Sequence, residues 1–490
     1  MVWKRGDKME RDEGKEYRTY QMDVKKGHRL FSYFEELCAN GNNLYNLTNF
    51  YIRQVYTALK SDKPLQPLQR EVLETIYRNI DKMNEKKTIA YYKKLKKENL
   101  LGKEKQKELE LFTLPTKEKA FVGYNFLDAL FKTIKQKDYY SLPGQINQQV
   151  IKNVVQNWDS FFKSLNGYKE NPQKYKGRPN IPRYLPKGSK KEVVLSNQIC
   201  QLKGEKYLRF PKTRGKLNIG KLANVSGKFQ QVRIIPKYDS FTIEVIFFIG
   251  KEVEIKPKKK RILSIDLGVE NIATLVSNVE VTPILFKGGK IKSVNRWYNK
   301  LKSYYYAALR NGRSSKEGQR YSKRLSKLDS KRHNQIKDFF HKVSFNIVKV
   351  AKEHHIDTII IGKNMDWKQK VALGSKNNQN FVQIPHAMLV SMIRYKANTE
   401  GIAVIETEES YTSRASFLDE DPIPTYKSGE KSDDIFSGKR ISRGMYRSKK
   451  GILINADVNG SANILRKVVP KAFANGIAVV CTQPLAVNVH

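Results

Sequence analysis

Four acidic residues in the second half of the sequence stand where a short strand ends or a helix begins. Asp266 closes the apolar run RILSI and precedes a Leu-Gly pair, and Glu408 and Glu409 follow the run IAVIET. Asp457 opens the segment DVNGSANILRK, whose apolar spacing predicts a helix. Carboxylates from separate elements can converge at one edge of a sheet and bind Mg²⁺, so this set suggests divalent-metal chemistry.

Each acid also has an ordinary structural interpretation. An Asp at a strand end before glycine is frequently a turn residue, and an Asp that opens a helix is frequently its N-cap. Glu408 and Glu409 could be solvated acids at a strand exit, and period-two alternation allows only one of them to face a shared site. Glu406 lies deeper in its strand and Asp366 lies past the end of the preceding strand, which makes both weaker candidates.

The elements that must position these acids follow a definite order. Three short apolar strands come first: RILSID, NIATLVS and VTPILF. A basic helical segment (291–355), the strand TIII, a helix near PHAMLVSMIRYKANTEG, the strand IAVIETE and the helix DVNGSANILRKV follow. This order predicts an α/β RNase H-like fold, in which the first three strands form a meander and the fourth and fifth lie parallel beside the first.

The fourth strand, TIII, ends at Gly362 and so offers no acid of its own. In a parallel arrangement its carboxyl end lies next to that of the fifth strand, about 4.8 Å away. A glutamate side chain can span that gap. We therefore predict that Gly362 leaves space for a carboxylate that arrives from the end of the fifth strand.

The amino-terminal half has a different pattern. EYRTYQMDVK alternates like an exposed strand, helical spacing runs from 29 to about 168, and period-two alternation between turn residues suggests a β domain from about 175 to 253. The 490-residue chain has 92 Lys and Arg against 48 Asp and Glu, a net charge of +44 spread along its length. This excess predicts a polyanionic partner. No apolar run is long enough to span a bilayer, so no membrane insertion is expected.

Three motifs resemble one known family. RILSIDLGVENIATLVSN, ESYTSRASFLD and INADVNGSANILRK are similar to the RuvC-like nuclease domain of the TnpB family of transposon-encoded RNA-guided nucleases, a domain shared with Fanzor proteins and CRISPR type V effectors. The motifs span about residues 258–470, and the amino-terminal half matches the family only in layout. The resemblance implies a wedge strand region (1–28), a helical recognition domain (29–174), a β wedge domain (175–257) and a RuvC-like nuclease domain (258–490). Within the last, the length and the Gly, Ser and charge content of about 414–450 suggest a lid, with a disordered linker as the alternative.

The sequence departs from most of the family in two places. Gly362 stands where most members have the second catalytic acid, and no CxxC zinc ribbon precedes Asp457, so no structural zinc is expected. In a subset of the family the acid lies instead in an ESYTS motif, whose glutamate is Glu409 here. The resemblance therefore implies that Asp266, Glu409 and Asp457 are the catalytic residues and bind Mg²⁺, with Mn²⁺ as a substitute.

Basic residues on two segments are candidates for nucleic-acid contacts. The helical segment would suit the backbone of a heteroduplex, and the stretch that replaces the zinc ribbon could contact the phosphates of the scissile strand. Solvated basic faces are the alternative for both segments. The candidates are Arg310, Arg320, Arg324, Arg332, Arg440, Arg443 and Arg447.

The expected function is that of a monomeric RNA-guided DNA endonuclease, which binds a guide RNA and double-stranded target DNA and cuts beside a short recognised motif. Two alternatives stay open. Gly362 favours a nuclease-inactive RNA-guided DNA-binding protein, but Asp266 and Asp457 are retained. A guide-free resolvase or transposase would use the same acids but does not need so long a basic segment ahead of them. The expected location is the cytoplasm of a bacterium or the nucleus of a eukaryote.

Overall fold

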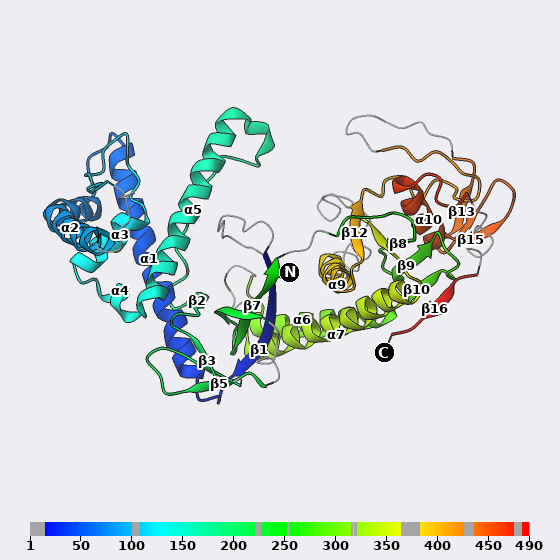
Figure 1. Ribbon diagram of the computed structural model, residues 1–490, viewed down its shortest axis with the longest axis horizontal. Helices are drawn as coiled ribbons and strands as arrows, with labels where there is room; N and C mark the ends of the chain where they lie inside the picture. The colour runs from blue at the N-terminus through cyan, green and yellow to red at the C-terminus, as the bar shows by residue number, and fades with distance from the viewer. Residues whose placement is uncertain are drawn as a thin grey trace. The chain divides into compact units, whose positions relative to one another are not determined.

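The computed structural model describes residues 15–99, 108–204, 206–220, 227–251, 255–314, 317, 321–363, 383–425, 436–474 and 483–489. The chain divides into two compact units, Met1–Glu252 and Val253–His490 (Figure 1). No described helix combines the length and the apolar character that a membrane crossing requires.

The first unit contains a helical part, a four-stranded antiparallel sheet and a small three-stranded sheet. The helices are α1 (Phe31–Lys60), α2 (Pro67–Asn99), α3 (Tyr124–Thr133), α4 (Lys137–Ser141), α5 (Gly144–Glu170) and the short 3-10 helix η1 (Pro172–Lys174). The larger sheet has the order β1 (Lys15–Lys25), β7 (Ser240–Lys251), β6 (Lys228–Pro236) and β2 (Val193–Ser196). The small sheet contains β3 (Gln201–Lys203), β4 (Tyr207–Arg209) and β5 (Lys216–Asn218).

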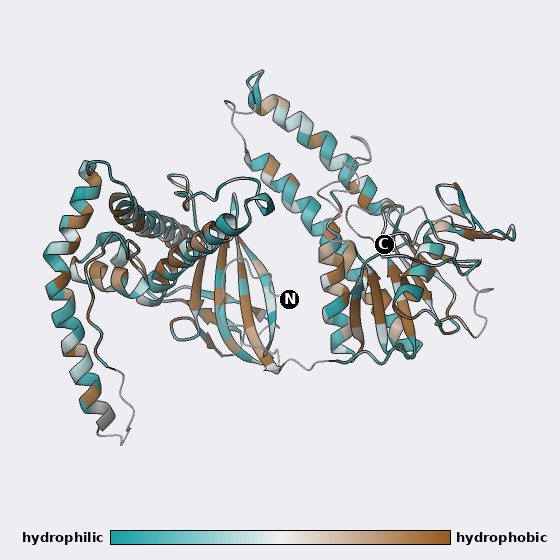
Figure 2. Ribbon diagram, turned by 90° about the horizontal axis from the view of Figure 1, so that it is seen from above, coloured by the Kyte–Doolittle hydropathy of each residue, from teal (hydrophilic) through white to brown (hydrophobic). Residues whose placement is uncertain are grey.

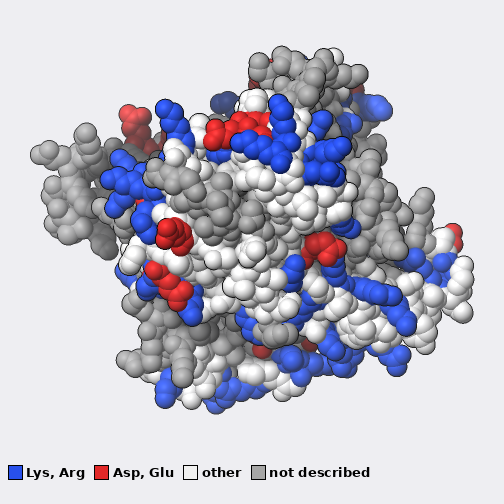
Figure 3. All heavy atoms as spheres, turned by 90° about the vertical axis from the view of Figure 1, so that its right-hand side faces the viewer, with Lys and Arg blue, Asp and Glu red and all other residues white. Residues whose placement is uncertain are grey.

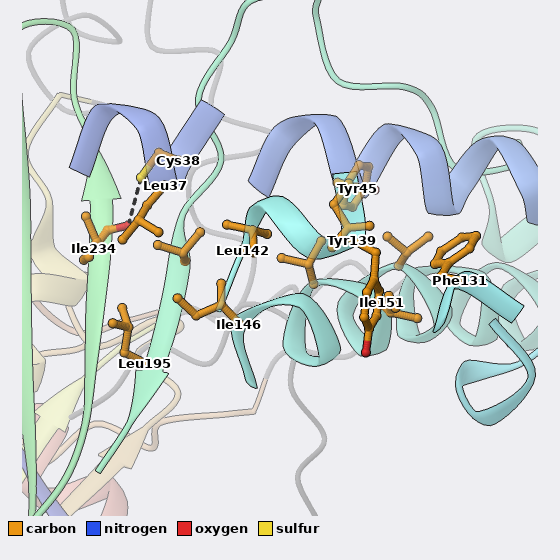
Figure 4. Packing of buried hydrophobic residues seen from close by; sticks show 14 of the residues in the cluster. Leu37, Cys38, Tyr45, Phe131, Tyr139, Leu142, Ile146, Ile151, Leu195 and Ile234 are labelled. Carbon is orange, nitrogen blue, oxygen red and sulfur yellow. Dashed lines mark hydrogen bonds between the residues drawn. The ribbon is translucent and has the colours of Figure 1, made fainter. Parts of the chain in front are cut away.

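The helices and the larger sheet of this unit share one hydrophobic core. Figure 4 shows Leu37 and Cys38 of α1 beside Ile234 of β6, and the Cys38 thiol donates to the Ile234 carbonyl oxygen at 3.9 Å. Leu195 of β2 and Ile146 of α5 belong to the same buried cluster. The helical and β segments therefore form one compact unit, and their assignment to recognition and wedge domains stays a prediction.

A six-stranded sheet forms the centre of the second unit. Its order is β12 (Ala403–Thr407), β11 (Thr358–Gly362), β8 (Ile262–Asp266), β9 (Asn271–Ser277), β10 (Ile284–Lys287) and β16 (Leu485–Val487). Strands β8, β9 and β10 form an antiparallel meander, whereas β11 runs parallel to β8 and β12 runs parallel to β11. These are the order and directions expected of an RNase H-like core, and β16 extends the sheet by pairing in parallel with β10.

Helices cover both faces of this sheet. They are α6 (Gly289–Arg310), α7 (Lys323–Glu353), α9 (His386–Thr399) and α10 (Ala456–Val468). Leu263 and Ile359 pack in one cluster with residues of α7 and α9, whereas their neighbours Ile262 and Ile360 pack with α10. Because the central strands are buried on both sides, they read as unbroken apolar runs in the sequence (Figure 2).

A three-stranded sheet takes two of its strands from the stretch expected to form a lid (414–450) and the third from the residues just after it. It contains β13 (Lys439–Ser442), β14 (Met445–Arg447) and β15 (Leu453–Asn455), which leads directly into α10. Tyr446 is buried, and its hydroxyl donates to the Arg414 carbonyl oxygen at 2.8 Å. Phe417 is buried in the cluster that contains Tyr446. Tyr446 and Phe417 therefore anchor this stretch to the second unit, whereas β13 is exposed.

Candidate active site

Asp266 is the last residue of β8, on the side of the strand that faces α10. A Cβ atom added to Gly460 of α10 would lie 2.9 Å from Asp266 Oδ2. The Ser264 hydroxyl, two residues earlier, lies 2.8 Å from the carbonyl oxygen of Ser461 and donates to it. The small residues at 460 and 461 thus let α10 approach the sheet closely enough to contact the carboxylate.

Asp457 does not cap α10. The N-cap is Asn455, whose side chain accepts hydrogen bonds from the backbone N–H groups of Asp457 at 3.0 Å and Val458 at 3.2 Å. The Asp457 carboxylate is left for other partners. Its Oδ2 accepts a hydrogen bond from the buried Asn271 amide at 2.6 Å, and Arg440 Nη2 lies 3.9 Å from its Oδ1.

Glu409 lies two residues beyond the end of β12, and its side chain reaches back to β11. A Cβ atom added to Gly362 would lie 2.8 Å from Glu409 Oε2 and 2.5 Å from Ile464 Cδ1. The glutamate carboxylate therefore occupies space that a side chain at position 362 would fill. The structure thus has the contact that the sequence suggested, and the catalytic role of Glu409 stays a prediction.

The other glutamates at this strand end have cationic partners. Glu408 pairs with Lys467. Glu406 pairs with Lys363 at 2.6 Å and also with Arg394. Their charges are therefore compensated locally. Asp366, the remaining candidate, lies outside the described residues.

The other two acids act electrostatically on Asp266. Burial and the nearby charges of Glu409 and Asp457 raise the pKa of Asp266 well above its ordinary value, while Arg440 acts in the opposite direction. Burial raises the pKa of Glu409 to about 7, with Glu408 adding to the shift and Lys467 opposing it. Negative charge is therefore concentrated where β8, α10 and the segment after β12 meet.

The chemistry of this donor set fits a hard divalent cation. Carboxylate oxygens are the ligands that Mg²⁺ prefers, and a cation would offset both the burial and the repulsion that raise the pKa of Asp266. Within the described part of the chain, no three Asp, Glu, His or Cys side chains form a group that could hold a metal ion as they stand. The acids therefore form an open cluster, which must draw closer if all three are to share an ion.

The predicted basic residues of the helical segment have different surroundings. Arg332 is engaged within the protein, since its guanidinium donates to Asn295 Oδ1 and to the Gln383 carbonyl oxygen, both at 2.7 Å. Arg310 lies over the Tyr306 ring at 4.6 Å. Two further candidates differ in status: Arg324 is exposed, and Arg320 lies outside the described residues.

The remaining basic candidates lie on the β13–β14 hairpin, and all of them are exposed. Arg440 is the one that comes close to the acids, and its guanidinium also donates to the Arg443 carbonyl oxygen. A hydrogen bond from Lys292 lowers the pKa of Glu270, and the charge of Arg443 adds to that effect. Arg447 is exposed on β14. On the face drawn in Figure 3, Lys and Arg side chains cover more of the surface than Asp and Glu do.

The sequence interpretation missed two residues that contact the acids or their neighbours. Asn271 opens β9 and donates to Asp457, and Lys287 Nζ donates in turn to Asn271 Oδ1 at 3.0 Å. Lys467 holds Glu408 from the last turn of α10. The N-cap of α10, Asn455, could have been predicted from the sequence, because Asn is among the preferred N-cap residues. The contact of Asn271 with Asp457 joins residues 186 positions apart and left no local signal.

Comparisons with known proteins match both halves of the second unit. The family OrfB_IS605, described as a probable transposase, matches residues 243–368, and the Cas12f1-like TNB domain matches residues 386–464. The TnpB-like protein ORF457 of Acidianus two-tailed virus is 25% identical over 225 residues, which are 45% of this chain and 44% of the viral protein. The chain thus matches less than half the length of that relative.

A second curated relative matches more of the chain. The CRISPR-associated endodeoxyribonuclease Cas12f1 of Sulfoacidibacillus thermotolerans is 24% identical over 396 residues, which are 74% of this chain and 86% of that protein. A solved Cas12f1–sgRNA–target DNA complex matches 92% of this chain and 100% of its own chain, at 12% identity and a TM-score of 0.30. The family and sequence matches confirm the resemblance to the TnpB family and its type V relatives.

Proposed function

We propose that this chain, a relative of the TnpB family and of type V effectors, is an RNA-guided DNA endonuclease that cuts with Asp266, Glu409 and Asp457. One observation carries the proposal: three acids from distant parts of the sequence lie near enough that Glu409 and Asp457 both act on the charge of Asp266. Two of them lie against glycines, Gly362 and Gly460, where a Cβ atom would crowd the carboxylates.

The relatives support the kind of substrate. One is named an endodeoxyribonuclease, and the Cas12f1 of the solved complex holds a single-guide RNA and target DNA. We extend both partners to this chain, together with recognition of a short motif beside the target. The net charge of +44 supports polyanionic partners as well.

Asp266, Glu409 and Asp457 would hold Mg²⁺ or Mn²⁺ at this site. Such an ion, when bound, would polarise a phosphoryl oxygen and lower the pKa of the water bound to it. The Asn271 amide fixes the Asp457 carboxylate by its 2.6 Å hydrogen bond. Arg440 is exposed beside Asp457, so its guanidinium is available to a phosphate of the strand to be cut.

The test begins with the RNA that copurifies with the expressed protein. Once sequenced, it identifies the guide, and a DNA target complementary to that guide with randomised flanks is then offered with Mg²⁺. We expect cutting beside a subset of flanks, and loss of cutting after either EDTA or RNase treatment. Cutting that survives EDTA refutes the metal mechanism, and cutting that survives RNase supports the guide-free enzyme. Guide-dependent binding without cutting in Mg²⁺ or Mn²⁺ supports the inactive binder.

A further inference from the structure

Glu409 has a positioning problem that the other two acids do not share. Asp266 belongs to β8 and Asp457 to α10, so regular backbone hydrogen bonds hold both. Strand β12 ends at Thr407, whose carbonyl oxygen accepts from Lys363 N at 2.8 Å. Glu409 comes two residues later, beyond the ladder between β11 and β12. Another part of the structure must fix it beside Gly362.

Helix α10 holds the segment that contains Glu409 through three polar residues at four-residue spacing. Asn459 donates to the Ala415 carbonyl oxygen at 2.8 Å, and Asn463 donates to the Thr412 carbonyl oxygen at 2.9 Å. Lys467 continues the series one turn later, since residues four apart lie on one face of a helix. Both asparagines are buried. The helix that supplies Asp457 therefore also fixes the path of the chain after Glu409.

Lys467 contacts both sequence neighbours of Glu409. Its ammonium group donates to the Glu408 carboxylate and, at 3.0 Å, to the Ser410 carbonyl oxygen. The same Glu408 carboxylate accepts from the Ser410 backbone N–H at 2.6 Å. The Lys467 side chain is only 9% exposed, so water cannot easily take its place. Residues 408 and 410 are therefore joined to each other and to the same buried ammonium group, with Glu409 between them.

We propose that Lys467 is a positioning residue for Glu409, which it holds beside Asp266 by clamping the residues on either side. The inference rests on the proposed function, because it assumes that Glu409 serves the metal site. The lysine also compensates the charge of Glu408, which would otherwise add to the negative charge beside Glu409. In agreement, Lys467 lowers the pKa of Glu409 while Glu408 raises it.

The direct test is Mn²⁺ binding to the full-length, metal-free protein, followed by electron paramagnetic resonance in the absence of DNA. Lys467→Met removes the charge and both hydrogen bonds, and we expect its dissociation constant for Mn²⁺ to rise about tenfold, as is typical when a residue that orients a metal ligand is lost. Lys467→Arg keeps the charge and its donors and should stay close to wild type. The matched control is Lys352→Met, which removes an ion pair with Glu400 in the same unit.

A second readout separates positioning from general damage. The Mg²⁺ concentration for half-maximal cutting should rise in Lys467→Met, while the rate at saturating Mg²⁺ recovers; an unfolded fraction would lower the rate at every concentration. If Lys467→Met does not fold, Lys467→Gln takes its place. The inference is overturned if the neutral variant binds Mn²⁺ as tightly as Lys352→Met, or if Lys467→Arg is as weak as the neutral variant. A wild-type protein that neither binds Mn²⁺ nor cuts defeats the proposed function instead.

Discussion

Asp266 lies in surroundings that oppose its own charge. Burial and two neighbouring carboxylates raise its pKa, whereas Asp357, at the other end of the sheet, accepts hydrogen bonds from Arg261 N at 2.8 Å and from the Thr358 hydroxyl. A group that destabilises the fold in its charged form is typical of a functional site. We therefore expect substitution by Asn to change the free energy of unfolding in opposite directions at Asp266 and at Asp357.

The first prediction concerns this contrast. Asp266→Asn should abolish guided cutting while leaving guide binding intact, and it should raise the free energy of unfolding of the metal-free protein at neutral pH by about 1 kcal/mol or more, because a repelled buried charge is removed. Asp357→Asn should keep cutting and lower the stability. Urea unfolding and a cleavage assay on both variants check this, and retained cutting by Asp266→Asn would remove it from the catalytic set.

Glu409 gives the second prediction, a pH dependence. Its pKa is about 7 in the metal-free fold, against about 4.3 for an unperturbed glutamate. Because the folded state holds the proton more tightly, this group stabilises the fold fully below about pH 4, and the contribution is lost as the pH rises through about 7. Asp266, whose pKa is also raised, changes stability in the same direction. Metal binding must displace these protons, so metal affinity should rise with pH over this window.

The measurement is thermal unfolding of the metal-free protein from about pH 5 to about pH 8, in wild type and in Glu409→Gln. Glutamine has no proton to lose, so the variant should lose less stability across this range, by roughly 2 to 3 kcal/mol for a shift of this size. Mn²⁺ should restore stability to wild type at the upper end of the range. Parallel curves for the two proteins would show that Glu409 is not the titrating group.

At the scale of elements, α10 is the scaffold on which the candidate site depends. It supplies Asp457, contacts Asp266 through the bare backbone at Gly460, packs Ile464 against Gly362 and holds the segment after Glu409. The helix therefore needs small residues on the side where it meets the sheet. At an exposed position in a helix, replacing glycine by alanine normally stabilises the protein by about 1 kcal/mol.

The third prediction follows from that position. In Gly460→Ala the new methyl group would lie 2.9 Å from Asp266 Oδ2, so the carboxylate must move. We expect the gain in helix propensity to be offset, with little net change in stability, while Mn²⁺ affinity falls about tenfold. Gly144→Ala, at the start of α5, is the control, because a Cβ atom there has nothing within 4 Å. Equal Mn²⁺ affinities would mean that Asp266 does not depend on this contact.

The elements differ in how well the sequence predicts them. Strands β8 to β11 were predictable because burial on both faces leaves apolar runs bounded by turn residues. The edge strand β12 is only partly buried, but it also has an apolar run. The three-residue strands β14, β15 and β16 were not, since so short a segment carries no period, and β16 pairs with β10 from about 200 residues away. Asp266 was a candidate by its place at a strand end and Glu409 by its match to the ESYTS motif, whereas the contacts of Lys467 depend on how α10 packs.

At the scale of the whole molecule, the excess of positive charge is the dominant property. Lys and Arg outnumber Asp and Glu by 92 to 48. Such an excess favours association with nucleic acid, whereas repulsion between the positive charges destabilises the compact protein. The exposed and the internal arginines should contribute differently. Arg324 projects into solvent, whereas Arg332 is bound to Asn295 and Gln383 within the second unit.

The fourth prediction uses salt to separate these contributions. Binding of the copurified guide RNA should weaken steeply with KCl, because each phosphate contact releases condensed counterions and adds about −0.7 to the slope of log K against log salt for single strands. Arg324→Gln should make that slope about one unit shallower if the residue contacts a phosphate. Arg332→Gln should leave the slope unchanged and lower the melting temperature, since it breaks two internal hydrogen bonds. Fluorescence anisotropy from about 50 to about 400 mM KCl measures the slopes; a shallower slope for Arg332→Gln would show that this guanidinium leaves its internal partners to meet the RNA.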